Sequence, residues 1–360
     1  MKQPAADSQL RPGAHVVLLQ PAFLGDVVLS TALLESWHRR YPEHTLSVVV
    51  RKAAAGLFEA HPFLKEVHVW DRAGWQKYPR LMGLSRQVKR GRPDVVINLH
   101  RFASMALLAR QTGAAVVTGF EGGTGLHARH AKLVSHEVGD GRHETERNHS
   151  QVEPWLGRWD SVRDVPTLHP GAAHRTAAAA WPRGAVILAP ASVWATKRWP
   201  AEKWAALADE CARKHGGVPL VLLGGNADAA LLESIAAQCK EAQPLVCAGR
   251  LNLLGAAALM SEAQVVVSND SAPLHMAGAV ETPVVGVFCS TTPRLGFGAL
   301  PGMVSAGRAE NVEVEEAALD CKPCGVHGHQ SCPVRDFKCG DGLEVGAVLG
   351  AMERVSSLPS

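Results

Sequence analysis

Ser268-Asn-Asp-Ser-Ala-Pro-Leu-His-Met-Ala-Gly-Ala-Val-Glu-Thr-Pro-Val-Val-Gly-Val287 is the stretch that decides the fold of this chain. Apolar residues 265–267 precede its polar start, and a second apolar run covers residues 284–288. Short apolar runs bounded by turn residues are typical of buried strands. The stretch therefore predicts a strand, a loop, a short helix and a second strand.

The start of this short helix predicts a site for an anion. Asp270 or Ser271 can cap the helix, and Pro273 suits its first turn, where a missing N–H costs nothing. The helix would point free amides and a partial positive charge out of the carboxyl end of a strand, where a phosphate group can bind. His275, one helical turn further along, is expected to face the same phosphate site. A structural cap without a ligand is the alternative interpretation.

Strand-like and helical runs alternate along both halves of the chain, which predicts an α/β fold with parallel sheets wrapped by helices. Expected strands cover residues 15–20, 46–50, 67–70, 95–99, 116–120, 186–189, 220–223, 265–268 and 284–288. Expected helices cover residues 26–41, 53–60, 75–90, 201–215, 227–240 and 253–260. A proline-rich break separates the halves, so we expect two doubly wound domains with a cleft between them. Ligands of such sheets bind at the carboxyl ends of the strands.

Composition favours an ordinary globular protein: 46% of the residues are hydrophobic and 20% are charged. The net charge of +3 is too small to indicate a nucleic-acid partner. No segment has the roughly 18–20 apolar residues of a membrane span, and the N-terminus does not resemble a signal peptide. Residues 72–101 are locally basic, with Asp94 as their one acid. This segment is either a solvated helix face or a surface for an anionic acceptor or membrane.

Three further loops follow expected strands. In the first, Gly25 permits a tight turn and Asp26 is either a helix cap or a general base held at the cleft. The second is rich in hydroxyl and cationic groups that suit a diphosphate leaving group, or a solvated loop; these are Ser192, Thr196, Lys197 and Arg198. The third allows backbone to approach a ligand closely, or forms a generic turn; it contains Gly224, Gly225 and Asn226.

Together these loops resemble the ADP-heptose:lipopolysaccharide heptosyltransferase family, glycosyltransferase family 9, over roughly residues 15–300. The matching signatures are residues 23–34 (FLGDVVLSTALL), 197–204 (KRWPAEKW), 222–225 (LLGG), 268–275 (SNDSAPLH) and 282–285 (TPVV). The resemblance implies a GT-B fold, with two Rossmann-like domains facing across a cleft. It implies an N-terminal acceptor domain (1–165), a linker (166–184), a C-terminal ADP-sugar domain (185–340) and a C-terminal helix (341–360).

The resemblance also implies roles for individual residues in an inverting transfer of heptose. Asp26 matches the general base, Lys197 the lysine at the donor phosphate, and Asp270 an acid that holds sugar hydroxyls. The remaining donor-binding residues implied are Gly25, Ser192, Thr196, Gly224, Gly225, Asn226, Ser271, Ala272 and His275. Many members have Thr-Gly where this chain has Ser271-Ala272. His100, Arg101 and Arg72 are the expected contacts to the anionic inner-core acceptor.

No organic cofactor is expected, and ADP-heptose is the implied donor substrate. The implied acceptor is the lipopolysaccharide inner core, in its lipid A–Kdo or heptosyl-Kdo form. The implied location is the cytoplasm. Any contact with a membrane would be peripheral, at the inner face of the inner membrane. Alternatives are a heptosyltransferase that modifies autotransporter proteins and a non-catalytic nucleotide-sugar-binding protein of the same fold. The presence of Asp26 together with Lys197 disfavours the second alternative.

A cysteine cluster and a histidine-rich run are the two remaining features of the sequence. Cys321, Cys324, Cys332 and Cys339 form a CxxC pair and two later thiols in the loop 321–339. In a reducing compartment such a set favours a zinc or iron knot over disulfides, with four free thiols as the alternative. The histidine-rich run has no regular ligand spacing and predicts a solvated loop; it comprises His127, His130, His136, His143 and His149.

Overall fold

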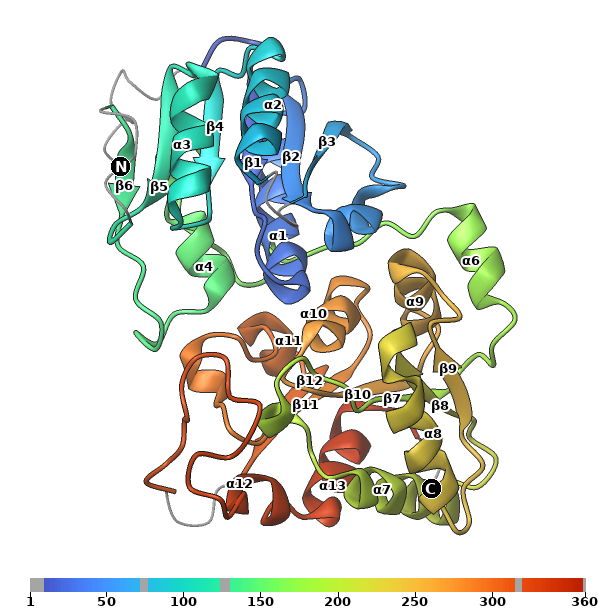
Figure 1. The fold of residues 1–360 in the computed structure, drawn as a ribbon. Coiled ribbons are helices and arrows are strands. Elements are labelled where there is room, and N and C mark those ends of the chain that lie inside the picture. Colours follow the sequence, from blue (N-terminus) through green and yellow to red (C-terminus); the bar gives the residue numbers. More distant parts are fainter. Residues whose placement is uncertain (1–9, 72–76, 124–129, 315–318, 359–360) are drawn as a thin grey trace. The chain divides into compact units, whose positions relative to one another are not determined.

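Two parallel β-sheets carry the fold, one in each of two units of the chain (Figure 1). The computed structural model describes residues 10–71, 77–123, 130–314 and 319–358. The first unit comprises Met1–Glu137 and Glu144–His169, and the second comprises Val138–His143 and Pro170–Ser360. The chain thus passes between the units three times, at residues 137–138, 143–144 and 169–170. The domain limits at residues 165 and 185 stay predictions.

Each sheet begins at its centre and grows outward in both directions. The first contains β1 (His15–Leu19), β2 (Thr45–Arg51), β3 (Leu64–Trp70), β4 (Val95–Asn98), β5 (Val116–Phe120) and β6 (Lys132–Val134) in the order β3-β2-β1-β4-β5-β6. The second contains β7 (Val186–Ala189), β8 (Leu220–Gly224), β9 (Leu245–Ala248), β10 (Val265–Asn269), β11 (Val284–Phe288) and β12 (Ala309–Glu313) in the order β12-β11-β10-β7-β8-β9. All strand pairs of the described residues are parallel. This confirms the predicted pair of doubly wound α/β sheets.

Helices connect the strands in both units. Those of the first unit are α1 (Leu24–Arg40), the 3₁₀ segment η2 (Lys52–Phe58), α2 (Lys77–Arg90), α3 (Ala103–Thr112), α4 (Glu144–His149) and α5 (Glu153–Leu156). Those of the second are α6 (Ala172–Ala178), η3 (Ala195–Lys197), α7 (Ala201–Lys214), η4 (Asn226–Asp228), α8 (Ala229–Gln238), α9 (Leu253–Met260), α10 (Ala272–Ala279), η5 (Pro293–Leu295), α11 (Pro301–Ser305), α12 (Lys338–Asp341) and α13 (Val345–Val355). Within the described part of the chain, no helix is both long enough and apolar enough to cross a membrane.

The central strands are buried on both faces, which is why they read as continuous apolar runs. Every residue of β1, β4, β7, β10 and β11 is buried. In the second unit Trp199 and Trp204 meet edge to face at 5.3 Å. The indole N–H of Trp199 donates to the carbonyl oxygen of Leu343 at 3.1 Å. This bond ties the segment before α13 to the start of α7 and closes the core.

The sequence prediction missed three edge strands and several helices, among them α3, α4, α5 and α11. All three edge strands are partly exposed; β6 and β12 contain charged residues, and β9 is an apolar run of only four residues. Helix α3 lies in a segment for which no element was predicted. Hydrogen bonding to an existing sheet, rather than local hydrophobicity, decides whether such a short polar segment becomes a strand.

The prediction of a solvated histidine-rich loop is wrong for its second half. His143 and His149 are buried, and the side chain of His136 is only 8% exposed. The His136 Nε2 atom lies 3.1 Å from a Glu144 carboxylate oxygen, which also accepts a hydrogen bond from the fully buried Arg147. Charged and polar groups inside a protein are buried in mutually bonded sets of this kind. His130 is exposed, and His127 lies outside the described residues.

Candidate functional site

Strands β7 and β10 lie side by side at the centre of the second sheet, where the strand order reverses. The connections that leave their carboxyl ends run to opposite sides of the sheet, and this divergence opens a crevice where ligands of doubly wound sheets bind. The loop after β7 covers residues 190–199, and β10 leads directly into α10. The two strongest sequence signatures therefore meet at one point of the sheet.

A buried ion pair joins these two loops. The Lys197 Nζ atom lies 2.6 Å from the Asp270 Oδ2 atom, and their side chains are only 11% and 7% exposed. The Thr291 hydroxyl, which follows β11, donates to the same oxygen at 2.6 Å. Removing one member of such a pair leaves an uncompensated charge in a low-dielectric site. The pair therefore fixes a cation and a carboxylate at the mouth of the crevice.

His275 lies on α10 behind this pair and carries no charge at neutral pH. Burial lowers the pKa of His275 to about 4, against the opposing effect of Asp270, and His143 and Lys197 lower it further. A neutral imidazole has one N–H donor and one acceptor nitrogen. His275 can therefore donate one hydrogen bond to a bound anion, but it adds no positive charge.

The N-terminus of α10 has free amides, as predicted. Ser271 is the N-cap residue, and its side chain accepts no hydrogen bond from the helix. Pro273 has no N–H, and the Leu274 N–H bonds to the Ser271 carbonyl oxygen. The described residues place no hydrogen-bond partner on the N–H groups of Ser271 and Ala272. These two amides point a partial positive charge at whatever fills the crevice.

The loop 190–199 is held in place from several sides. The Asn269 carboxamide accepts a hydrogen bond from the backbone N–H of Trp199 at 3.0 Å and donates one to the Pro190 carbonyl oxygen at 2.5 Å. The Arg198 Nε atom donates to the Ser192 carbonyl oxygen at 2.7 Å. The guanidinium of Arg198 thus bonds to the backbone of its own loop, whereas Lys197 of the same loop reaches Asp270.

Gly224 and Gly225 allow the chain to pack on itself at the end of β8. A Cβ atom on Gly224 would lie 3.0 Å from the Asp228 Cβ atom. The Gly225 N–H donates to the Asp228 carboxylate at 2.8 Å. A Cβ atom on Gly249 would lie 2.8 Å from the Asn226 Cα atom. The close contacts at Gly224 and Gly249 explain these two glycines structurally, and a role of this loop in donor binding stays a prediction.

The first unit repeats the same arrangement with its own candidate residues. Strands β1 and β4 pair at the reversal point of the first sheet. Asp26 lies in the first turn of α1, where its carboxylate accepts a hydrogen bond from the Phe23 N–H at 3.1 Å. His100, after β4, is buried against the Phe102 ring at 4.6 Å, while Arg101 is exposed. Arg72 lies outside the described residues.

Three residues that support the site were missed in the sequence. Asn269 connects the loops after β7 and β10, Thr291 bonds to Asp270, and His143 lies close enough to influence His275. Thr291 follows the carboxyl end of a strand, so the rule that identified the other loops also applies to it. His143 belongs to the second unit although its neighbours in sequence belong to the first, and no local pattern signals this.

The cysteine-rich loop packs directly on the candidate site. The Thr196 hydroxyl accepts from the His329 N–H at 2.8 Å and lies 3.0 Å from the Ser290 hydroxyl. The Cys324 N–H donates to the Ser290 carbonyl oxygen at 2.9 Å. Gly328 adopts a φ of +73°, and a Cβ atom there would lie 2.9 Å from the Thr196 hydroxyl oxygen. The Thr196 hydroxyl, predicted to contact the donor, is thus already engaged by this loop.

The four thiols of the loop differ in environment. None of the described cysteines forms a disulfide, and no three metal-ligating atoms of the loop lie within 4.8 Å of one another. Burial raises the pKa of Cys339 to about 11. Backbone N–H groups, with that of Phe337 foremost, lower the pKa of Cys332. Zinc or iron at this loop stays a prediction.

Comparisons with known proteins show the family of this chain. The family model described as glycosyltransferase family 9 (heptosyltransferase) matches residues 81–319. The chain is 26% identical over 286 residues to lipopolysaccharide heptosyltransferase 3 of Escherichia coli strain K12. The aligned region covers 74% of this chain and 80% of that protein.

Two solved structures have the same fold. A glycosyl transferase family 9 protein of Veillonella parvula superposes with a TM-score of 0.82 at 22% identity, over 97% of this chain and 98% of that one. The ADP-heptose lipopolysaccharide heptosyltransferase II of E. coli gives a TM-score of 0.72 at 18% identity, over 95% of this chain and 98% of that one. The α/β fold is of the predicted GT-B class. With the family model matching well over half of its length, the chain belongs to glycosyltransferase family 9, the heptosyltransferases.

Proposed function

We propose that this enzyme transfers heptose from ADP-heptose to the lipopolysaccharide inner core with inversion at the anomeric carbon. The observation that carries the proposal is the buried Lys197–Asp270 pair beside the free amides of α10. A cation and a helix N-terminus at one point suit a diphosphate, and a carboxylate next to them suits sugar hydroxyls. The two relatives named above as lipopolysaccharide heptosyltransferases support the choice of donor and acceptor.

On the donor side, Lys197 and the amides of Ser271 and Ala272 would neutralise the charge that develops on the departing ADP. His275 would add one neutral hydrogen bond, because burial keeps it uncharged. Preorganised donors in a buried site stabilise such a charge without reorganising at the moment of reaction. Asp270 would orient the sugar through its hydroxyls. Ala272 in place of glycine keeps the backbone amide but leaves less room for the approach of a ligand.

On the acceptor side, Asp26 would act as the general base. The α1 N-terminus favours its ionised form, and its hydrogen bond to the Phe23 N–H orients the carboxylate. An ionised carboxylate is a weak base in water, but it accepts a proton effectively from a hydroxyl that becomes acidic as attack proceeds. Inversion requires one such base opposite the leaving group.

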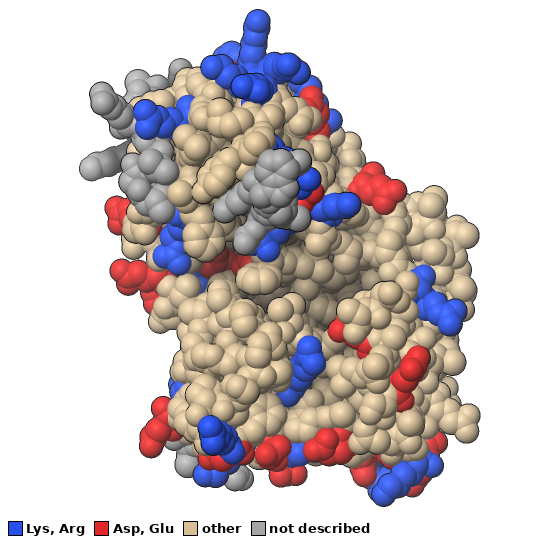
Figure 2. All heavy atoms as spheres, viewed as in Figure 1, with Lys and Arg blue, Asp and Glu red and all other residues tan. Residues whose placement is uncertain are grey.

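The basic segment supports an anionic acceptor. Its described side chains on and after α2 are exposed; these are Arg80, Arg86, Lys89, Arg90 and Arg92. Figure 2 shows lysine and arginine side chains gathered at the end of the first unit that carries α2. Arg80 is paired with Asp71 at 2.6 Å. A surface of this kind attracts carboxylates and phosphates, whether on an inner-core sugar or at a membrane surface.

The direct test measures ADP release with ADP-heptose and three acceptors: Kdo2-lipid A, its monoheptosylated form, and an autotransporter passenger domain. We expect release with one of the two lipid acceptors and a product that is heavier by one heptose. Release with the passenger domain alone would instead establish the protein-modifying alternative. A protein that binds ADP-heptose but releases no ADP with any acceptor would be a non-catalytic binding protein.

The cysteine loop is proposed to hold zinc or iron as a structural knot beside the donor site. Backbone N–H groups that lower the pKa of Cys332 favour a thiolate, the form that ligates metals. Protein purified without a histidine tag should contain roughly one equivalent of metal more than its variant in which Cys321 and Cys324 are both serine. Cys247→Ser, in the β9 strand, is the matched control. A difference of less than about a tenth of an equivalent between the two proteins would contradict the proposal.

A further inference from the structure

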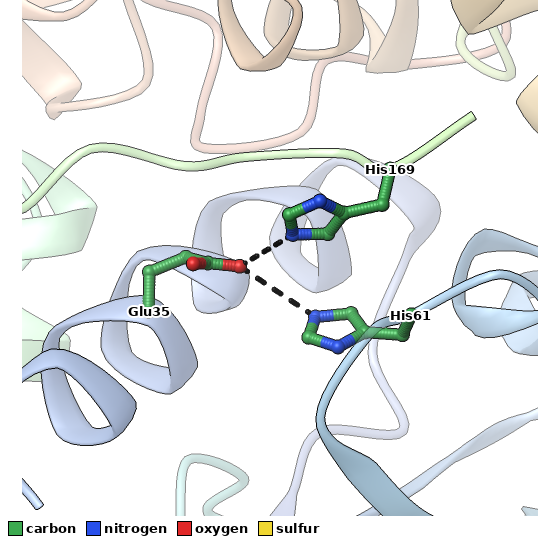
Figure 3. A group of neighbouring side chains, drawn as sticks. All are labelled: Glu35, His61 and His169. Carbon is green, nitrogen blue, oxygen red and sulfur yellow. Dashed lines mark hydrogen bonds and ion pairs between the residues drawn. The ribbon is translucent and has the colours of Figure 1, made fainter. Parts of the chain in front are cut away.

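A further cluster of metal-ligating side chains lies in the first unit and contains none of the residues assigned a role above. Glu35 lies on α1, His61 follows η2, and His169 is the last residue of the unit. Figure 3 shows both imidazole rings turned toward the Glu35 carboxylate. One ligating atom from each residue lies within 4.8 Å of the other two.

The distances suit a small divalent ion. The Glu35 Oε1 atom lies 2.7 Å from the His169 Nε2 atom and 3.7 Å from the His61 Nε2 atom. Around a tetrahedral zinc ion with bonds of about 2.1 Å, donor atoms lie roughly 3.4 Å apart. The observed distances lie on either side of this value, so small side-chain rotations would bring the atoms to it.

His61 is the observation that points to a ligand. Its side chain is only 2% exposed, and neither of its ring nitrogens has a hydrogen-bond partner among the described residues. A buried polar atom without a partner is rare and costs about 1–3 kcal/mol.

The cluster continues a row of contacts between α1 and the end of the unit. Ser36 donates to the Asp164 carboxylate at 2.7 Å, and the Thr167 N–H donates to the Thr31 hydroxyl at 3.0 Å. The pairing of Glu35 with His169 is the next contact of this series. An ion bound there would fix residues 164–169 to α1 at a third point.

We infer that Glu35, His61 and His169 form a zinc site that fastens the last segment of the first unit to α1. Two imidazoles and one carboxylate are a ligand set typical of Zn²⁺ and leave a fourth position for water. The side chains of Glu35 and His169 are 19% and 28% exposed, so an ion can enter from solvent. The site is independent of the cysteine loop in the second unit.

The test uses the full chain, purified without a histidine tag and stripped with a chelator. Titration with ZnCl2 against a chromophoric competitor should give a tight site, with a Kd of about 1 μM or below, and a raised Tm. His61→Ala and His169→Ala should each weaken this affinity by at least about 10-fold. His68→Ala is the matched control, because His68 is equally buried and lies 3.3 Å from Glu66 without a third ligand.

Cobalt substitution separates this site from the cysteine loop and from a folding defect. Co²⁺ bound to two histidines and a carboxylate should give visible absorption without the thiolate charge-transfer band of a cysteine site. That spectrum should persist when Cys321 and Cys324 are both serine and disappear in His169→Ala, whose side chain is partly exposed and tolerates replacement. Zinc affinity unchanged in both histidine variants, or cobalt absorption carried entirely by thiolates, would overturn the inference.

Discussion

Asp26→Asn should lower kcat by about 10³-fold while the affinity for ADP changes less than about threefold, because the substitution removes a general base and little else. The asparagine carboxamide has nearly the same shape, and its oxygen can still accept the hydrogen bond from the Phe23 N–H. The start of α1 should therefore keep its conformation. Steady-state ADP release and calorimetric titration with ADP measure the two quantities.

Asp160→Asn is the control for this experiment. Its carboxylate also accepts a backbone N–H, that of Val162 at 2.9 Å, in the same unit. It should retain full transfer activity. If Asp26→Asn kept more than about a tenth of the wild-type kcat, Asp26 would not be the base. A collapse of ADP affinity together with a lowered Tm would mean that Asp26 acts structurally.

Lys197→Met should lower kcat/KM by about 10²–10³-fold and also destabilise the protein, because it removes the leaving-group cation and leaves Asp270 buried without its partner. The double variant Lys197→Met with Asp270→Asn separates these two effects. It removes both charges, so most of the lost stability should return, whereas transfer should stay low. Thermal unfolding and ADP release measure stability and transfer side by side.

A second buried pair in the same unit provides the matched control. The Lys322 Nζ atom lies 3.4 Å from the Glu313 carboxylate, and the two side chains are 8% and 18% exposed. Lys322→Met should therefore lower the Tm but leave transfer per folded molecule unchanged. If Lys197→Met with Asp270→Asn regained wild-type kcat/KM, the Lys197–Asp270 pair would be structural only.

Much of the fold could be predicted because its central strands are short, apolar and buried. Helix α9 begins and ends where the sequence predicted, and α1, α7 and the central strands differ by no more than two residues at either end. The predictions failed where burial does not follow hydrophobicity. The edge strand β12 is polar at several positions and is held by its pairing with β11. The side chain of His136, only 8% exposed, bonds to Glu144 together with the buried Arg147, so the polarity of the histidine-rich run wrongly predicted a solvated loop there.

The sequence by itself determined the two doubly wound sheets and which loops leave the carboxyl ends of their strands, because local periodicity and turn residues encode both. Only the tertiary structure decided which side chains in those loops meet. Lys197 reaches Asp270 because β7 and β10 are neighbours, and Thr196 is engaged by His329 because the cysteine-rich loop folds back on the site. Contacts between residues so far apart depend on strand order and packing, which no local pattern records.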